Sequence, residues 1–466
     1  MHGYGTCVLH LWDTALREVR PLEPREPGKV SLYVCGPTPY ADPHVGHARL
    51  LLVYDVLRRY LEWKPTPPRL NPIGWTPHEV RHVSNITDIE DKIIARAAEE
   101  GIAPEELVER NEAAWFALSD RLGALRPHEI PRATAYVERM VAFIAGLVDR
   151  GHAYATSDGV YFEVATLEDY GLLLHQSLDS LKAGARVEMV EDKRGPHDFS
   201  LWKTAKPGEP SWESPWGAGR PGWHIECTVM ALDLLGDGFD LHGAGTDLVF
   251  PHNENERAQA VAGGHAFARH WLHNGMLNAG GEKMSKSLGN VVSLDELLKG
   301  RDARALRLLV LRSHYRSQME VSPAALDDAQ AALDRLNSLS RRFPEDAPEG
   351  EEGRSEFMAR MNNDLDTPGA VAHIFDQVRV ANLTNDAKDA RRLATLVREL
   401  CSWLGLELDR GSEVDPATAE LVRQREQARA EKDWAAADAL RAEIEAAGWT
   451  IEDSQAGTKV WRSGPA

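Results

Sequence analysis

The chain has 466 residues, 43% of them hydrophobic and 27% charged, which is typical of a globular protein with more than one hydrophobic core. No apolar run is long enough to span a bilayer, the first residues do not resemble a secretory signal, and four cysteines are too few for a disulfide framework. We therefore expect a cytoplasmic protein without a membrane segment. The net charge of −19 argues against a nucleic-acid partner unless basic residues cluster locally.

The first part of the chain predicts a strand, a loop and a helix in close succession. Residues 30–35 form a short β-prone run and 36–43 contain three prolines, so a buried strand and then a loop are expected. Apolar residues recur at helical spacing over 50–61, which predicts a helix that begins near residue 45. His44 and His47 then lie at a helix N-terminus, where backbone N–H groups favour phosphate, although such histidines also serve as ordinary caps.

The rest of the chain mixes strands and helices before it becomes helical. In chain order we expect a strand running into a helix over 83–92, helices over 99–148, a β-rich insertion over 154–187, a loop over 193–221, a helix over 223–235, a strand over 239–242, a turn over 243–245, a helix beginning near 252 and a strand over 271–277. Residues 302–408 predict helices with an acidic break at 345–354, and 417–461 predict one or two helices and two short strands.

Five arginines over 301–316, against a single acidic residue, form a local basic stretch in this acidic chain. Such a stretch favours contact with phosphates, and it is equally typical of a solvated helix face. The sequence leaves both interpretations open.

The segment 283–287, which reads Lys-Met-Ser-Lys-Ser, predicts a loop with two mobile positive charges and two hydroxyls. Alone, it would be interpreted as a solvated basic loop. Together with residues 44–47, which read His-Val-Gly-His, it resembles the two signature motifs of class I aminoacyl-tRNA synthetases. The resemblance implies that the two histidines and the two lysines are catalytic. The residues that it assigns to ATP are His44, Gly46, His47, Lys283, Ser285, Lys286 and Ser287.

Four candidate metal ligands are scattered along the chain. Cys35 ends the first predicted strand, Cys227 lies in the helix predicted over 223–235, and His252 and Glu256 share one face of the next predicted helix. Two thiolates, an imidazole and a carboxylate are zinc ligands by type. Their spacing forms no paired metal motif, and free cysteines are usually small buried hydrophobic residues, so the residues alone do not decide for a metal.

Three segments carry a closer resemblance. Residues 33–38 (Tyr-Val-Cys-Gly-Pro-Thr), 222–227 (Gly-Trp-His-Ile-Glu-Cys) and 250–256 (Phe-Pro-His-Asn-Glu-Asn-Glu), with the lysine loop, resemble the cysteinyl-tRNA synthetase family, and the match runs nearly end to end. The resemblance implies one zinc ion per chain, and its ligands would be Cys35, Cys227, His252 and Glu256. The chain departs from the family at Asn253, where a second histidine is common, and at Ala244, which stands in a turn usually built from glycines.

The resemblance also implies the substrates and their contacts. We expect a monomer that uses L-cysteine, tRNA(Cys) and ATP with Mg²⁺, and no membrane partner. The residues implied around the cysteine are Cys35, Thr87, Trp223, His242 and Asp247. Cysteine and serine are nearly isosteric, so a hydrophobic pocket would separate them poorly, whereas zinc prefers a thiolate strongly.

The expected fold is α/β: a doubly wound, Rossmann-type parallel sheet with an insertion, followed by a helical bundle and a small C-terminal anticodon-binding module. The predicted domains are the first half of the catalytic domain over 1–125, a connective insertion over 126–221, the second half with the lysine loop over 222–300, a helical domain over 301–413 and the C-terminal module over 414–466.

The expected activity is the ATP-dependent ligation of L-cysteine to tRNA(Cys) through a cysteinyl-adenylate. Two alternatives come from related proteins. A mycothiol-pathway ligase, which joins cysteine to an amino sugar, resembles the catalytic half but lacks the tail module, so the tail over 417–461 argues against it. A non-catalytic RNA-binding paralogue would usually have lost one signature motif, and both motifs stand intact here.

Overall fold

The computed structural model describes two compact units. The described residues are 8–64, 76–176, 192–279, 282–283, 294–347, 353–411, 415–454 and 457–462. The first unit runs to Leu294 and includes Val310–Val321 and Met358–Pro368, and the second unit holds the remainder. None of the described helices is both long and apolar enough to cross a bilayer.

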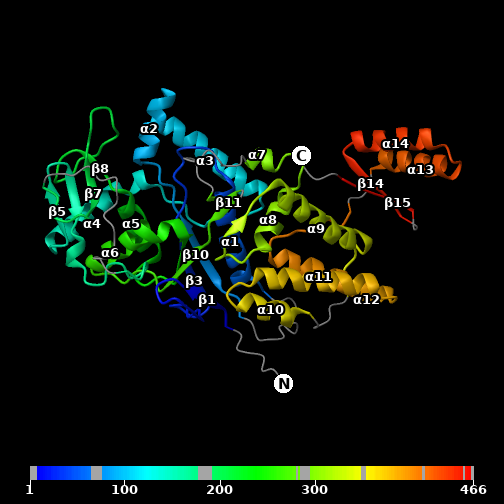
Figure 1. The fold of residues 1–466 in the computed structure, drawn as a ribbon, viewed down its shortest axis with the longest axis horizontal. Coiled ribbons are helices and arrows are strands. Elements are labelled where there is room, and N and C mark those ends of the chain that lie inside the picture. The colour runs from blue at the N-terminus through cyan, green and yellow to red at the C-terminus, as the bar shows by residue number, and fades with distance from the viewer. Residues whose placement is uncertain are drawn as a thin grey trace, which may run out of the picture. The chain divides into compact units, whose positions relative to one another are not determined.

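A four-stranded parallel sheet forms the centre of the first unit (Figure 1). Its strands are β3 (Lys29–Val34), β4 (Glu79–Ser84), β9 (Leu241–Gly245) and β10 (His270–Asn274), in the order β10-β9-β3-β4. Apart from their ends and Arg81 in the edge strand β4, these strands are buried, as expected for a parallel sheet that is covered on both faces. The doubly wound α/β class predicted from the sequence is confirmed.

Helices cover the two faces of this sheet. Successive residues of a strand point to opposite faces. Tyr33 of β3 packs in one apolar cluster with Met230 of α5 (Trp223–Leu235), whereas Val34 lies with Tyr54 of α1 (Val45–Glu62) around a small internal cavity. Both helices begin and end close to where the sequence predicts them. Helix α1 carries apolar residues at helical spacing, whereas α5 is buried over most of its length.

An insertion separates β4 from β9. Its helices are α2 (Asp91–Glu100), α3 (Pro104–Arg121) and α4 (Val137–Asp149), and its antiparallel sheet has the order β5 (Ala153–Thr156), β6 (Gly159–Phe162), β7 (Phe199–Thr204) and β8 (Gly219–Pro221). The loop predicted over 193–221 is therefore wrong, since it contains β7 and β8. These strands are short and flanked by prolines and glycines, and they form because β7 pairs with β6, far away in the sequence.

The turn predicted over 243–245 is also wrong, because these residues continue strand β9. Small residues are required there by close packing: a Cβ on Gly243 would overlap the Tyr54 ring. The Tyr54 hydroxyl in turn donates to the carbonyl oxygens of Ala244, at 3.0 Å, and Leu272, at 2.7 Å. Glycine therefore marks contact between a helix and a strand here, and the sequence signal for a turn was misleading.

Two smaller sheets complete the first unit. They are the hairpin β1 (His10–Asp13) and β2 (Glu18–Pro21), and the sheet β12 (Glu282–Lys283), β11 (Leu277–Ala279) and β13 (Met319–Glu320), with β11 in the middle. The strand predicted over 271–277 is thus two strands, β10 and the start of β11, with a break at Gly275.

The C-terminal part of the chain is helical, as predicted. Its elements are α7 (Leu294–Leu297), α8 (Ala303–Leu311), α9 (Pro323–Arg342), α10 (Arg354–Asn362), α11 (Thr367–Leu383), α12 (Ala387–Trp403), α13 (Pro416–Ala430), α14 (Trp434–Ala446), β14 (Trp449–Ser454) and β15 (Gly457–Arg462). The last four have an apolar cluster of their own, centred on Ile444, Trp449 and Ile451. The predicted domain boundaries stay a prediction.

Candidate active site and metal centre

The candidate site lies at the carboxyl ends of the parallel strands. In this fold, ligands bind where neighbouring strands of the sheet lead to connections on opposite faces. Cys35 follows β3 at this position, between β4 on one side and β9 on the other. The chain turns away at Gly36, where a Cβ would overlap the carbonyl oxygen of Asn85. Glycine at 36 therefore lets the segments after β3 and β4 run in direct contact.

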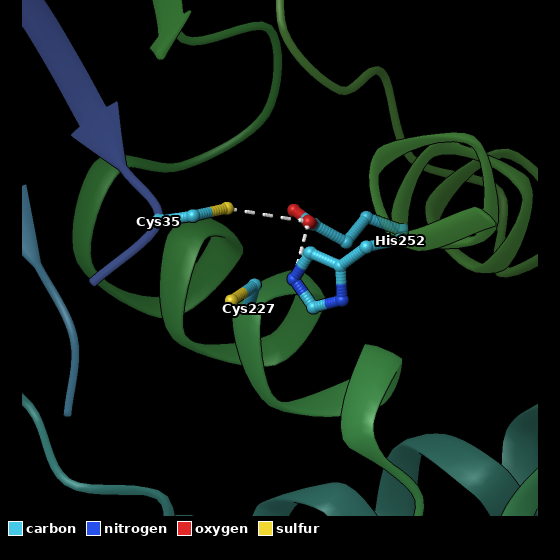
Figure 2. A group of neighbouring side chains, drawn as sticks. Cys35, Cys227 and His252 are labelled. Carbon is cyan, nitrogen blue, oxygen red and sulfur yellow. Dashed lines mark hydrogen bonds and ion pairs between the residues drawn. The ribbon is translucent and has the colours of Figure 1, made fainter. Parts of the chain in front are cut away.

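The four predicted metal ligands meet at this edge. One ligand atom from each of Cys35, Cys227, His252 and Glu256 lies within 4.8 Å of the other three, and all four residues are at most 2% exposed. Figure 2 shows the side chains of Cys35, Cys227 and His252 grouped together, with dashed lines from the Cys35 sulfur and the His252 ring to one carboxylate. In a tetrahedral zinc site, the ligand atoms lie about 3.3–3.8 Å apart, so this set fits a zinc ion after a small contraction.

Neighbouring side chains hold the Glu256 carboxylate in place. Its Oε2 lies 2.7 Å from Nε2 of His242, and its Oε1 lies 2.9 Å from Nε2 of His252. Asn253 donates to the same Oε1 at 2.8 Å and lies 3.5 Å from the Cys35 sulfur. Second partners of this kind orient ligands and raise metal affinity.

The titration of the group favours a cation. Burial alone would raise the pKa of Glu256, but the adjacent His242 and His252 rings lower it well below its usual range. Burial also raises the Cys35 pKa, while at Cys227 the contacts with Cys35 and His252 outweigh burial and lower the pKa to about 6. Although burial would lower it, the pKa of His252 is raised to about 10 by Glu256 and Cys227, so its ring balances part of the negative charge of these two groups. A divalent cation would neutralise the charge of the carboxylate and the thiolate in place of that proton.

The two histidines of the first motif cap helix α1. Nδ1 of His44 accepts from the backbone N–H of Gly46 at 3.1 Å, and Nδ1 of His47 accepts from the backbone N–H of His44 at the same distance. Their rings stack, with centroids 3.9 Å apart. Both line a cavity of about 290 Å³, together with Cys35, Trp223 and Asp247. One cavity is therefore lined by three of the residues predicted for ATP and by three of those predicted for cysteine.

The other predicted residues lie around this cavity or outside the described part. His242 is buried behind the metal ligands, 3.9 Å from the Cys35 sulfur. Thr87 is buried beside Asn85, and its backbone N–H donates to Pro37. Lys283 contributes its backbone to β12. Ser285, Lys286 and Ser287 lie outside the described residues.

Three residues at the site were missed by sequence reasoning. Asn85 accepts from the Gly36 backbone at 2.9 Å and lies 3.6 Å from the Cys227 sulfur. His224 contacts His252 through their Nδ1 atoms, 2.9 Å apart. Lys92 lines the cavity. Its Nζ lies 5.5 and 5.8 Å from the Tyr40 and Trp223 rings. No pattern in the sequence marked them, because each reaches the site only through the fold.

A larger cavity, of about 530 Å³, lies beside α2 and α3 and away from the metal ligands. Its lining combines apolar side chains with the carboxylates of Asp88, Glu105, Glu109 and Glu112. Carboxylates repel phosphates, so the smaller cavity with the histidine motif is the better candidate for ATP.

The basic stretch over 301–316 is largely engaged within the protein. Arg301 pairs with Asp327 at 2.7 Å, Arg304 with Asp302 at 2.5 Å, and Arg316 with Asp364 at 2.5 Å. Arg307 is fully buried. The structure therefore favours structural ion pairs over a free track for phosphates at these positions.

Comparison with protein families divides the chain into three matches. Residues 21–331 match the catalytic domain of class I (C) tRNA synthetases, 356–409 match the DALR domain, and 412–462 match the cysteinyl-tRNA ligase anticodon binding domain. The first match alone spans well over half of the chain.

Known proteins resemble the chain over its full length. The cysteine–tRNA ligase of Chromobacterium violaceum is 45% identical over 473 aligned residues, which cover 98% of this chain and 100% of that protein. The cysteine–tRNA ligase of Dehalococcoides mccartyi is 42% identical over 467, with 97% and 99% covered. A solved methionyl-tRNA synthetase of Mycobacterium tuberculosis, in complex with methionyl-adenylate, aligns with a TM-score of 0.55 at 17% identity over 81% of this chain and 90% of that one, which shows a shared fold. By its sequence, the chain belongs to the cysteine–tRNA ligase family of class I aminoacyl-tRNA synthetases.

Proposed function

We propose that this chain activates L-cysteine with ATP and transfers it to tRNA(Cys), as a monomer in the cytoplasm. The observation that carries the proposal is that Cys35, one of the four clustered candidate metal ligands, lines the same cavity as the histidine motif. In the first step the cysteine carboxylate attacks the α-phosphate of ATP and pyrophosphate leaves. In the second step the hydroxyl of the terminal adenosine of the tRNA attacks the carbonyl carbon and AMP leaves.

Selection of cysteine over serine is assigned to Cys35, Cys227, His252 and Glu256. Zinc bound to them would accept the substrate thiolate and hold it deprotonated at neutral pH, which a serine hydroxyl does not match. A preference of 10³–10⁵ corresponds to roughly 4–7 kcal/mol, beyond what pocket shape supplies for isosteric side chains. His242 and Asn253 support this choice by holding the carboxylate of Glu256 from the side.

Binding of ATP is assigned to the start of α1 and to the lysine loop. His44, Gly46 and His47 lie where the helix dipole favours phosphate. Lys283 and Lys286 would meet negative charge that develops on the phosphates, with Mg²⁺ on the ATP itself. The chemistry needs no nucleophilic side chain, because positioning and charge stabilisation lower the barrier. Trp223, Thr87 and Asp247 would surround the cysteine.

Recognition of the tRNA is assigned to the C-terminal elements. Helices α13 and α14 and the hairpin β14–β15 lie within the range that matches the anticodon binding domain. This module also argues against an amino-sugar ligase, which would lack it, while the intact motif residues argue against a non-catalytic paralogue.

One assay separates the proposed function from both alternatives. Purified protein is incubated with ATP, L-cysteine and either transcribed tRNA(Cys) or an amino-sugar acceptor, with serine as the competing substrate. We expect acylation of tRNA(Cys) alone and no product with serine. Transfer to the amino sugar would favour the ligase alternative, and absence of cysteine-dependent pyrophosphate exchange would favour the non-catalytic one.

A further inference from the structure

One buried guanidinium connects the histidine helix to the sheet that carries Lys283. Arg49 lies two residues after His47 in α1 and is 1% exposed. Its terminal nitrogens donate to the carbonyl oxygens of Met276, at 2.8 Å, and of three residues that precede β13. Those three are His314, at 3.2 Å, Tyr315, at 3.1 Å, and Ser317, at 2.5 Å.

Arg49 thereby holds the base of the sheet β12-β11-β13 on both sides. Met276 immediately precedes β11, and its carbonyl oxygen also accepts from the backbone N–H of Met319 in β13. Strand β11 pairs with β12, where Asn278 faces Lys283. The position of the Lys283 backbone is therefore set through β11 by contacts that begin in α1.

The packing around this contact leaves no room for adjustment. A Cβ on Gly275 would overlap the carbonyl oxygens of Arg316 and Ser317, and its N–H donates to Tyr315 at 2.7 Å. The carboxylate of Asp364 holds the same segment, because it accepts hydrogen bonds from the Tyr315 hydroxyl at 2.6 Å and from Nε of Arg316 at 2.7 Å.

The chemistry of Arg49 is unusual for a purely structural residue. Within the described part of the chain it pairs with no carboxylate, and burial lowers its pKa to about 10. A buried cation without a counterion is costly, so the four carbonyl oxygens that accept from Arg49 have to offset its desolvation. A guanidinium has five N–H donors in a rigid fork and can hold several carbonyls in fixed positions, which a lysine cannot do.

We infer that Arg49 is a positioning residue that fixes the distance between the two halves of the ATP site. It sets Lys283 relative to His44 and His47 by anchoring the start of β11 and the segment before β13 to α1. The inference rests on the proposed role of Lys283 in ATP activation. No contact between Arg49 and substrate is required.

The test is Arg49→Lys, which keeps the charge and removes the fork. We expect cysteine-dependent pyrophosphate exchange to slow by roughly 10²-fold in kcat, because misplacement of about 1 Å has that effect. The KM for cysteine should stay unchanged. In a Lys283→Ala background the same substitution should slow the reaction by less than about 3-fold, because groups that act as a unit are not additive.

Arg58→Lys is the matched control. Arg58 is a second buried arginine of α1, and it bonds the carbonyl oxygen of Arg126 at 2.7 Å and Nε2 of His128 at 2.9 Å, away from β11. Arg58→Lys should lower the temperature of the thermal transition without slowing pyrophosphate exchange.

Should Arg49→Lys fail to fold, Tyr315→Phe loosens the same segment by removing one hydrogen bond to Asp364. It should reproduce the pattern with a smaller loss in kcat.

The outcomes separate this inference from the proposed function. If Lys283→Ala is slow and Arg49→Lys still slows that variant by the full 10²-fold, the two residues act independently. That result would overturn the inference and leave the proposed function intact. A raised KM for ATP at unchanged kcat would also overturn it and show direct contact with ATP, since Arg49 lines the cavity. A Lys283→Ala enzyme at full rate would overturn the proposed role of Lys283 and the inference with it.

Discussion

The two ends of the candidate active site are built differently. At the proposed cysteine end, the four candidate metal ligands are at most 2% exposed, and neighbours such as Asn253 and His242 contact the Glu256 carboxylate. At the ATP end, the ring nitrogens of His44 and His47 bond within their own helical turn. The other expected contributors come from β12 and the segment after it. In the proposed function, selection uses one buried site, whereas activation uses charges from two segments that Arg49 holds in position.

This difference matches the chemistry of each end. A preference of one thiol over one hydroxyl needs a site that does not adapt, because an adaptable site would accept the isostere. Phosphoryl chemistry needs charges that meet the transition state more strongly than the ground state, and in the proposed function these come from the start of α1 and from the lysine loop. Substitutions of the candidate metal ligands should therefore abolish zinc binding, whereas substitutions at the ATP end should lower the rate of adenylate formation.

The largest expected effect is the loss of the metal in Cys227→Ala. Metal analysis of the purified protein should show about one zinc per chain in the parent and almost none in the variant, because three ligands remain in a site built for four. Cys401→Ala is the control, since Cys401 is an equally buried free cysteine in the other unit. Zinc retained at full stoichiometry in Cys227→Ala would contradict the assigned ligand set.

The next effect concerns the ATP end. Lys286→Ala should slow pyrophosphate exchange by about 10²-fold or more, because one cation at developing charge contributes roughly 2.7–4 kcal/mol. Binding of cysteine should change little, and the zinc content should stay at that of the parent. Lys299→Ala, an exposed lysine nearby in sequence, should leave the rate intact. An unchanged exchange rate in Lys286→Ala would show that the lysine loop is only a solvated surface segment.

A smaller effect is expected in the C-terminal module. Trp434 begins α14 and is 60% exposed, so its ring is free to stack on a base of the anticodon loop. Trp434→Ala should lower charging of tRNA(Cys) by about 5- to 100-fold, which corresponds to roughly 1–3 kcal/mol of stacking. Adenylate formation should not change. Trp434→Phe, which keeps a ring, should recover most of the charging, and equal charging by all three proteins would exclude this residue from RNA binding.

The smallest effect separates fold stability from metal chemistry. His82 of β4 is buried with both ring nitrogens lacking a partner in the described part, and burial lowers its pKa to about 3. In the unfolded chain this histidine takes up a proton near pH 6.5, whereas in the folded chain it stays neutral down to about pH 3. The free energy of unfolding therefore falls as the pH is lowered from about 6.5 toward 3, by about 1.4 kcal/mol per pH unit. In zinc-loaded protein, His82→Gln should flatten the fall in unfolding free energy between about pH 6 and 4. Equal slopes of unfolding free energy against pH in the parent and in His82→Gln would contradict the role given to His82.

The sequence predicted the elements that carry regular apolar patterns. Strand β3 and helix α1 were placed within a residue or two, because a buried apolar run and apolar residues at helical spacing are both visible along the chain. Helix α5 was placed as closely, although it is buried over most of its length. The strands β7 and β8 were missed because they depend on pairing with β6, and the end of β9 was mistaken for a turn because its glycines serve the Tyr54 contact.

The site was predictable only as far as its motifs extend. Cys35, Cys227, His252 and Glu256 are separated by up to 221 residues, and their spacing alone did not single them out. The resemblance to a family selected them, and the structure brings them together. Asn85, Lys92 and Arg49 were not predicted, since each contributes through contacts between segments that are distant in sequence.

The central claim is that the metal ligands select the thiolate of the substrate. The most direct measurement replaces zinc with cobalt and records the near-ultraviolet absorption from sulfur-to-metal charge transfer. Titration with L-cysteine should add intensity that corresponds to a further thiolate, and serine at the same concentrations should add none. A cobalt-loaded protein that makes cysteinyl-adenylate while its spectrum stays unchanged at saturating cysteine would show that selection occurs elsewhere.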